Sequence, residues 1–178
     1  MIPDAALRAL AGTLYAEPEP VYAVIDGAGC PALLPMLDRH QVPSVCLYRG
    51  ELEPELAEAA PYLAQLLPDS PFTRWFLGEG WDRHWGILLR TDATLAEVRR
   101  HLRRLTMARL PDQRVVYFRF YDPRVLRVYL PTCNAGEAER FFGPVRTIAM
   151  EAPEPRTLLG MTRGPGGEVV ESKVPLGG

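Results

Sequence analysis

The chain contains 178 residues, of which 47% are hydrophobic, and it carries a formal net charge of −2 at pH 7. Its length suits one domain, or one domain with a small appendage, and its composition argues against a disordered chain. No apolar run approaches the ~20 residues that span a bilayer, and the N-terminus lacks the basic-then-apolar order of a signal peptide. We therefore expect a cytoplasmic protein without a membrane span.

The first half of the chain alternates between predicted helices and predicted strands. Residues 3–15 carry leucines at helical spacing, and the apolar run 21–25 ends at an Asp26–Gly27 turn. The further elements expected here are helices at 31–40, 54–60 and 71–79 and strands at 44–48, 62–67 and 85–90.

The second half continues the alternation. Thr94 to Glu97 is a capping-box pattern that opens a helix, and Asn134 to Glu137 is a second such pattern. The remaining expected elements are a strand at 115–120, a helix beginning at 123, and two C-terminal runs at 157–161 and 169–174.

This alternation predicts the fold class. Because strands and helices alternate over residues 20–150 with short connections, we predict an α/β fold with a central mixed or mostly parallel sheet flanked by helices. The C-terminal runs predict a short hairpin or a loose tail. The predicted organisation is an α/β domain at 1–150 and a C-terminal extension at 151–178.

The near-neutral net charge hides a strong asymmetry. Residues 51–69 contain five acids and no basic residue, whereas residues 99–127 contain nine arginines against two aspartates. A basic face on an acidic protein suits a partner with an acidic or carbonyl-rich surface, and nucleic acid is a weaker alternative. Solvated helix faces would also explain the arginines.

The segment 115–131, VVYFRFYDPRVLRVYLP, is the most informative part of the chain. Asp122 stands where a helix N-cap belongs and Pro123 where a first helical residue belongs, so a strand is followed by a helix within two residues. This short connection predicts a rigid ledge of side chains that could bind a partner. The ledge residues are Arg119, Tyr121, Asp122, Arg124 and Arg127.

An enzymatic alternative rests on residues 27–32, GAGCPA, which match G-x-G-x-x-A between a strand and a helix. This pattern suits dinucleotide binding, but Asp26 would place a carboxylate beside the phosphates and Pro31 removes an amide donor. We therefore expect the glycines to form a tight strand-to-helix turn without a nucleotide.

Other chemistry has little support. The three histidines show no metal-binding spacing, and the three cysteines form no CxxC pair, so we expect no metal site and buried reduced thiols. A binding module accounts for more features, since arginines and the tryptophans at 75, 81 and 85 are enriched at protein interfaces.

Several segments together resemble a known family. The succession YAVIDGA, LYRGEL, EAAPYLAQL, HWGILLRTDATLAEVRRHLRRL, VVYFRFYDPRVLRVYLPT and FFGPV is similar to the type VI secretion effector adaptors, catalogued as a domain of unknown function. The likeness runs from about Val21 to about Glu151, and FRFYDPRVLR is its most specific part. The matching positions are Trp85, Gly86, Arg90, 118–124, Arg127 and 141–144.

The resemblance implies a chaperone that is not an enzyme and needs no cofactor. Such adaptors bind a toxic effector and help load it onto the spike-tip protein of the secretion machine. We accordingly expect partner binding through Trp85 and Arg90 as well as the ledge, with an effector segment and the spike tip as partners. We expect neither nucleic acid nor a membrane among the partners.

Overall fold

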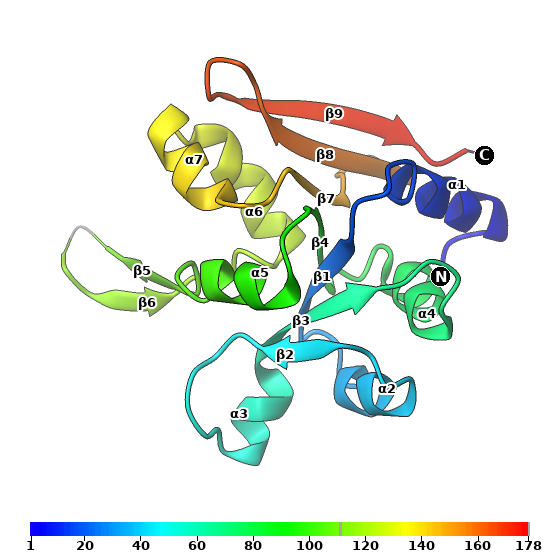
Figure 1. Ribbon diagram of the computed structural model, residues 1–178, viewed down its shortest axis with the longest axis horizontal. Helices are drawn as coiled ribbons and strands as arrows, with labels where there is room; N and C mark the ends of the chain where they lie inside the picture. Colours follow the sequence, from blue (N-terminus) through cyan, green and yellow to red (C-terminus); the bar gives the residue numbers. More distant parts are fainter. Residues whose placement is uncertain (111, 178) are drawn as a thin grey trace.

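The computed structural model describes residues 1–110 and 112–177. Its centre is a seven-stranded sheet of order β2-β3-β1-β4-β7-β8-β9 (Figure 1), in which each neighbouring pair is antiparallel. The strands are β1 (Val21–Asp26), β2 (Ser44–Cys46), β3 (Pro61–Leu66), β4 (Gly86–Arg90), β7 (Thr147–Glu151), β8 (Thr157–Arg163) and β9 (Val169–Pro175).

Helices cover both faces of this sheet and enclose two hydrophobic cores. The first core joins one face to α1, α2 and α4, and the second joins the other face to α5, α6, η1 and α7. The helices are α1 (Asp4–Leu14), α2 (Leu33–Arg39), α3 (Pro54–Ala59), α4 (Pro71–Gly80), α5 (Leu95–Leu102), α6 (Pro123–Tyr129), η1 (Leu130–Thr132) and α7 (Ala135–Phe142).

Strand β1 shows how the sequence builds both cores. All six of its residues are buried, and successive side chains point to opposite faces of the sheet. Ala23 and Ile25 enter the first core, whereas Tyr22 and Val24 enter the second. The continuous apolar run therefore reflects a central strand with helices on both sides, and it places Asp26 at the end of a fully buried element.

The prediction of a mixed or mostly parallel sheet is wrong. β1 and β2 do run in the same direction, as a strand–helix–strand unit predicts, because each pairs antiparallel with β3. However, β3 lies between them, and no parallel pair forms among the described strands. The sequence pattern indicated the strand–helix–strand order but could not show that a later strand would pair between the two strands.

Two strands were missed, and the strand predicted at 115–120 ends at Tyr117. β7 and β5 (Met107–Arg109) were not predicted, and β6 (Val115–Tyr117) pairs with β5 rather than with the main sheet. The β5–β6 hairpin extends away from the body of the molecule (Figure 1). Because it lies outside both layers, Tyr117 remains 60% exposed.

The C-terminal residues 151–178 were predicted to be an extension. Within this segment β8 and β9 form a hairpin, and β8 pairs with β7, so the hairpin forms the edge of the main sheet. The predicted boundary near residue 150 stays a prediction. No helix in the described part of the chain is long and apolar enough to cross a membrane.

The predicted helix caps are confirmed. Thr94 and Glu97 form a capping box at the start of α5, and Asn134 and Glu137 form one at the start of α7. Cys30 is buried, the other two cysteines are half-buried, and all three thiols are free.

Candidate functional site

An ion pair joins the end of β1 to the segment that follows β6. Arg119 Nη2 donates to Asp26 Oδ2 at 2.6 Å. Asp26 is only 2% exposed, whereas half of the Arg119 side chain reaches solvent. Burial alone would lower the pKa of Arg119, but the Asp26 carboxylate raises it above its usual value. The pair therefore anchors the ledge segment to the centre of the sheet.

The predicted cap at Asp122 is confirmed, and its carboxylate does more than cap. Asp122 Oδ1 accepts from the Arg124 backbone N at 2.9 Å and from Arg124 Nε at 3.0 Å, while Oδ2 accepts from Nη2 at 2.8 Å. Burial would raise the pKa of Asp122, yet the hydrogen bonds from Arg124 lower it below its usual value. Arg119 Nη2 also lies 3.7 Å from Asp122 Oδ2. Asp26, Arg119, Asp122 and Arg124 thus form a row of alternating negative and positive charges.

Tyr121, another ledge residue, faces the protein interior. It is 3% exposed, and its ring packs against Phe120 with 5.6 Å between centroids. Burial and the neighbouring Tyr48 hydroxyl raise the pKa of Tyr121 above the ordinary tyrosine value. The structure thus places Tyr121 in the second core, where it supports the ledge from beneath.

Helix α6 carries the exposed part of the ledge. Arg124, Arg127 and Val128 share one helix face because they are spaced three and four residues apart. Val128 is 68% exposed, and Val125 and Tyr129 beside this face are also exposed. Arg127 forms no ion pair with any described residue. Sequence reasoning identified the arginines but missed these apolar side chains, although the run VLRVY placed apolar residues on more than one helix face.

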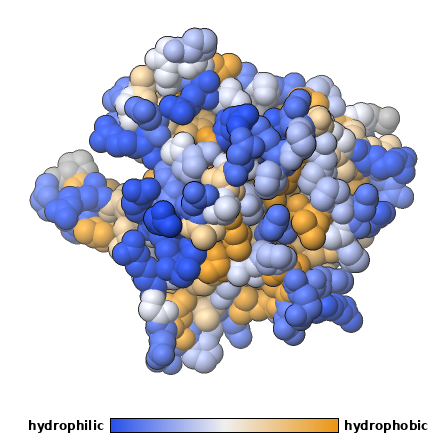
Figure 2. Space-filling model, viewed as in Figure 1, coloured by the Kyte–Doolittle hydropathy of each residue, from blue (hydrophilic) through white to orange (hydrophobic). Residues whose placement is uncertain are grey.

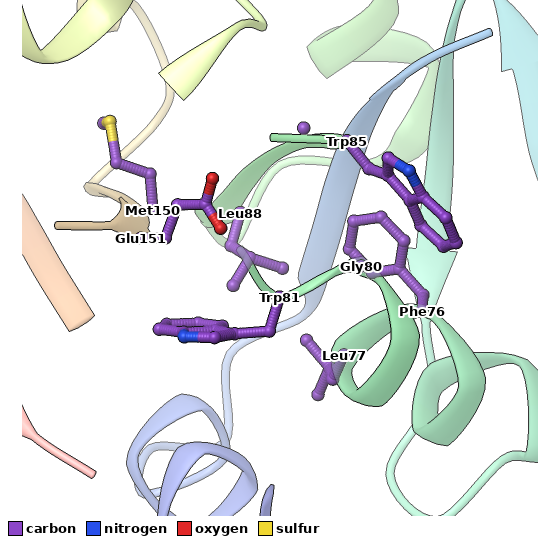
Figure 3. A pocket seen from close by; sticks show the side chains of 9 residues that line it. Phe76, Leu77, Gly80, Trp81, Trp85, Leu88, Met150 and Glu151 are labelled. Carbon is purple, nitrogen blue, oxygen red and sulfur yellow. The ribbon is translucent and has the colours of Figure 1, made fainter. Parts of the chain in front are cut away.

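Trp85 lies against a small cavity rather than on an open surface (Figure 3). It is 8% exposed, its ring centroid lies 5.3 Å from that of Trp75, and the Arg83 guanidinium lies 5.4 Å from the ring. The adjacent cavity, lined by Trp81, Met150 and Glu151 among others, has a volume of about 30 Å³. A void of this size holds about one water molecule, so the structure places Trp85 in core packing.

The structure separates Arg90 from the ledge. Arg90 pairs with Val21 at the start of β1, whereas Asp26 ends that strand, so the two sites lie at opposite ends of the sheet. Arg90 Nε lies 3.7 Å from Glu19 Oε2, and Arg146 Nη1 contacts Glu19 Oε1 at 2.7 Å. Arg90 therefore belongs to a second charge cluster, remote from Arg119.

One contact between the turn before β4 and the end of β7 escaped sequence reasoning. The sequence shows no partner for His84, but His84 Nδ1 contacts the buried Glu151 carboxylate from β7. The Glu151 carboxylate also accepts from the Asp82 backbone N at 2.6 Å. Asp82 and His84 both adopt positive φ, +62° and +57°, so this acid stabilises a turn that ordinary residues disfavour. The sequence could not indicate this pairing of His84 with Glu151, because 67 residues separate the two partners.

The G-x-G-x-x-A segment forms a tight turn packed against protein backbone. A Cβ atom at Gly27 would lie 2.2 Å from the Glu58 carbonyl oxygen and 2.5 Å from that of Ala60. The absence of a side chain at Gly27 thus allows the end of α3 and the residue before β3 to pack against it. The neighbouring Asp26 carboxylate is paired with Arg119. Because both neighbours of β1 are antiparallel, the segment is not part of the parallel β-α-β unit that binds dinucleotides.

The comparison with protein families places the chain. A family model described as "Domain of unknown function (DUF4123)" matches residues 21–140. This match spans more than half of the chain, and the chain belongs to that family. The matched residues include the ledge, the β5–β6 hairpin and α6. No curated protein and no solved structure gives a significant match.

Proposed function

We propose that this chain is a cytoplasmic adaptor, or chaperone, that binds a type VI secretion effector and helps load it onto the spike tip. Membership of the DUF4123 family supports the proposal, because the matched residues contain the segment FRFYDPRVLR that carries the resemblance to these adaptors. The proposed role is binding without catalysis, and it requires no cofactor.

The observation that carries the proposal is the exposed surface of α6. The buried Asp122 carboxylate caps the first turn of this helix and also pairs with Arg119, so the start of the helix is held in place. From that fixed start, the helix carries the half-buried Arg127 beside the 68% exposed Val128. A rigid helix with arginine beside apolar side chains has the composition of a protein interface, and its pre-organisation reduces the entropy lost on binding.

The experiment is co-purification with a toxin encoded by a neighbouring gene. The informative variant is Arg127→Ala/Val128→Ser, because neither side chain forms a hydrogen bond or ion pair with described residues and the fold should be kept. Recovery of the toxin should fall about tenfold or more, which corresponds to at least about 1.4 kcal/mol of binding free energy.

The matched control is Arg74→Ala/Leu67→Ser. Arg74 is exposed on α4 and Leu67 is 48% exposed after β3, so this variant also loses one arginine and one exposed apolar side chain. Toxin recovery should match the wild-type chain. Equal recovery with the α6 variant would place the effector interface elsewhere, and no recovery with the wild-type chain would contradict the adaptor proposal.

A further inference from the structure

A basic hollow lies between α5 and the loop that follows β2. Its volume is about 310 Å³, and its walls are the side chains of Arg49, Ala96, Arg99, Arg100 and Arg103. Figure 2 shows hydrophilic surface over α5 and toward this loop, on the face that is turned to the viewer. Four of the five wall residues are cationic, so an apolar ligand finds no complementary surface there.

Local structure explains why these arginines converge. Residues 96, 99, 100 and 103 share one face of α5, because they are spaced three or four residues apart. Arg103 Nη2 donates to the carbonyl oxygens of Cys46 at 3.0 Å and Tyr48 at 2.9 Å. These two bonds hold the loop against the helix, and the next residue of the loop, Arg49, thereby completes the hollow.

The hollow lacks the acids that neutralise the ledge. Among the described residues, no carboxylate lies within ion-pair distance of Arg49, Arg99, Arg100 or Arg103. The Nε atoms of Arg99 and Arg103 are buried without a hydrogen-bond partner in the same part of the chain. Burial lowers the pKa of Arg103, and the positive charges of Arg99 and Arg49 lower it further. Uncompensated like charge of this kind is relieved by a bound anion.

The surroundings select the class of anion. Glu51 and Glu53 follow Arg49 in the same loop, so the basic surface ends there and suits a short anionic segment better than a long polyanionic strand. Next to Arg49, the ring of Tyr48 packs against that of Tyr117 of the β5–β6 hairpin in a tilted arrangement, with 5.1 Å between the centroids. On that hairpin Met107, the cross-strand partner of Tyr117, is also exposed. An acidic peptide segment with apolar flanks matches both the hollow and this apolar hairpin surface.

We propose that the hollow binds carboxylate side chains of an acidic segment in a partner protein. Arginine suits this ligand because its guanidinium group donates two parallel hydrogen bonds to one carboxylate. The inference deepens the proposed function and rests on it in one respect, namely that the partner is a protein. It also assigns a role to arginines that the α6 surface does not use.

The test is a fluorescence-anisotropy titration of the purified full chain with a fluorescein-labelled hexaglutamate peptide at fixed ionic strength. The variant Arg49→Gln/Arg100→Gln removes two exposed side chains that form no bonds with described residues, and it leaves Arg103 to hold the loop. The control Arg8→Gln/Arg39→Gln removes the same charge from exposed positions on α1 and α2, across the sheet.

The wild-type chain should bind the peptide. The hollow variant should bind it at least about tenfold more weakly, and the affinity of the control variant should lie within about twofold of the wild-type value. Equal loss in both variants would reveal general charge attraction and overturn the proposal. A thymidine oligonucleotide or tripolyphosphate that binds more tightly than the peptide, with the same loss in the hollow variant, would assign the hollow to phosphates and overturn it too. Because the titration needs no effector, its failure would leave the co-purification result standing.

Discussion

Removing Arg119 should destabilise the fold by leaving the Asp26 carboxylate buried without its partner. Asp26 is 2% exposed, and Arg119 is the side chain that donates to it. Breaking a buried pair in this way costs about 3–5 kcal/mol. Half of the Arg119 side chain is exposed, so its removal admits water to Asp26. We therefore expect Arg119→Ala to lower the free energy of unfolding by about 2–3 kcal/mol.

A double-mutant cycle in urea measures this coupling. Asp26→Ala should cost about 1 kcal/mol, because it removes the buried charge together with the pair and leaves Arg119 hydrated. Adding Arg119→Ala to Asp26→Ala should then cost little more, which gives a coupling energy of about 2–3 kcal/mol. The control is Arg114→Ala: Arg114 contacts Asp112 at 2.7 Å, but both side chains are more than half exposed.

The control should therefore change stability by less than about 0.5 kcal/mol, although the ion-pair distance is nearly the same. The reasoning fails if Arg119→Ala and Arg114→Ala have similar effects, since burial of the acid would then not decide the cost. It also fails if the two substitutions at Asp26 and Arg119 are simply additive.

Three further experiments test other parts of the structure. Asp122→Ala should lose about 2 kcal/mol of unfolding free energy in urea at neutral pH, because it removes both the α6 cap and the partner of Arg124. Burial lowers the pKa of His101 below 6.5 in the folded chain. The contribution of neutral His101 to folding stability is therefore fully present above about pH 6.5 and falls as the pH drops below that value. His101→Gln should flatten the pH dependence of the urea midpoint between about pH 7.5 and 5.5. Gly27→Ala should lose at least about 2 kcal/mol because its Cβ would meet backbone, while Gly12→Ala, with open space around it in α1, should be neutral or gain up to about 1 kcal/mol.

The sequence predicted local structure correctly where the interacting residues lie within a few positions of one another. The capping boxes at Thr94 and Asn134 and the N-cap at Asp122 each depend on residues within three positions, and all three are confirmed. The sheet type could not be obtained in this way. It depends on β3 entering between β1 and β2, and no residue in those strands encodes which neighbour a later strand will choose.

The candidate site shows the same division between local and long-range information. The grouping of Arg119, Asp122 and Arg124 follows from their spacing, but the pairing of Arg119 with Asp26 spans 93 residues. Asp26 was read instead as a turn residue that opposed phosphate binding. Arg90, which the resemblance grouped with the ledge, lies at the opposite end of the sheet because β4 runs antiparallel to β1.

The distribution of acids divides the arginines of residues 99–127 into two physical roles. Arg119 and Arg124 lie against buried carboxylates, so their charge is already used to hold the start of α6 in place. Arg99, Arg100 and Arg103 surround a hollow with no acid of the described chain in ion-pair contact, and their charge remains available to a ligand. Substitutions in the first group should therefore act mainly on stability, and those at exposed positions of the second mainly on binding. The acidic protein keeps a basic site because no acid of the described residues lies within ion-pair distance of the arginines in the hollow.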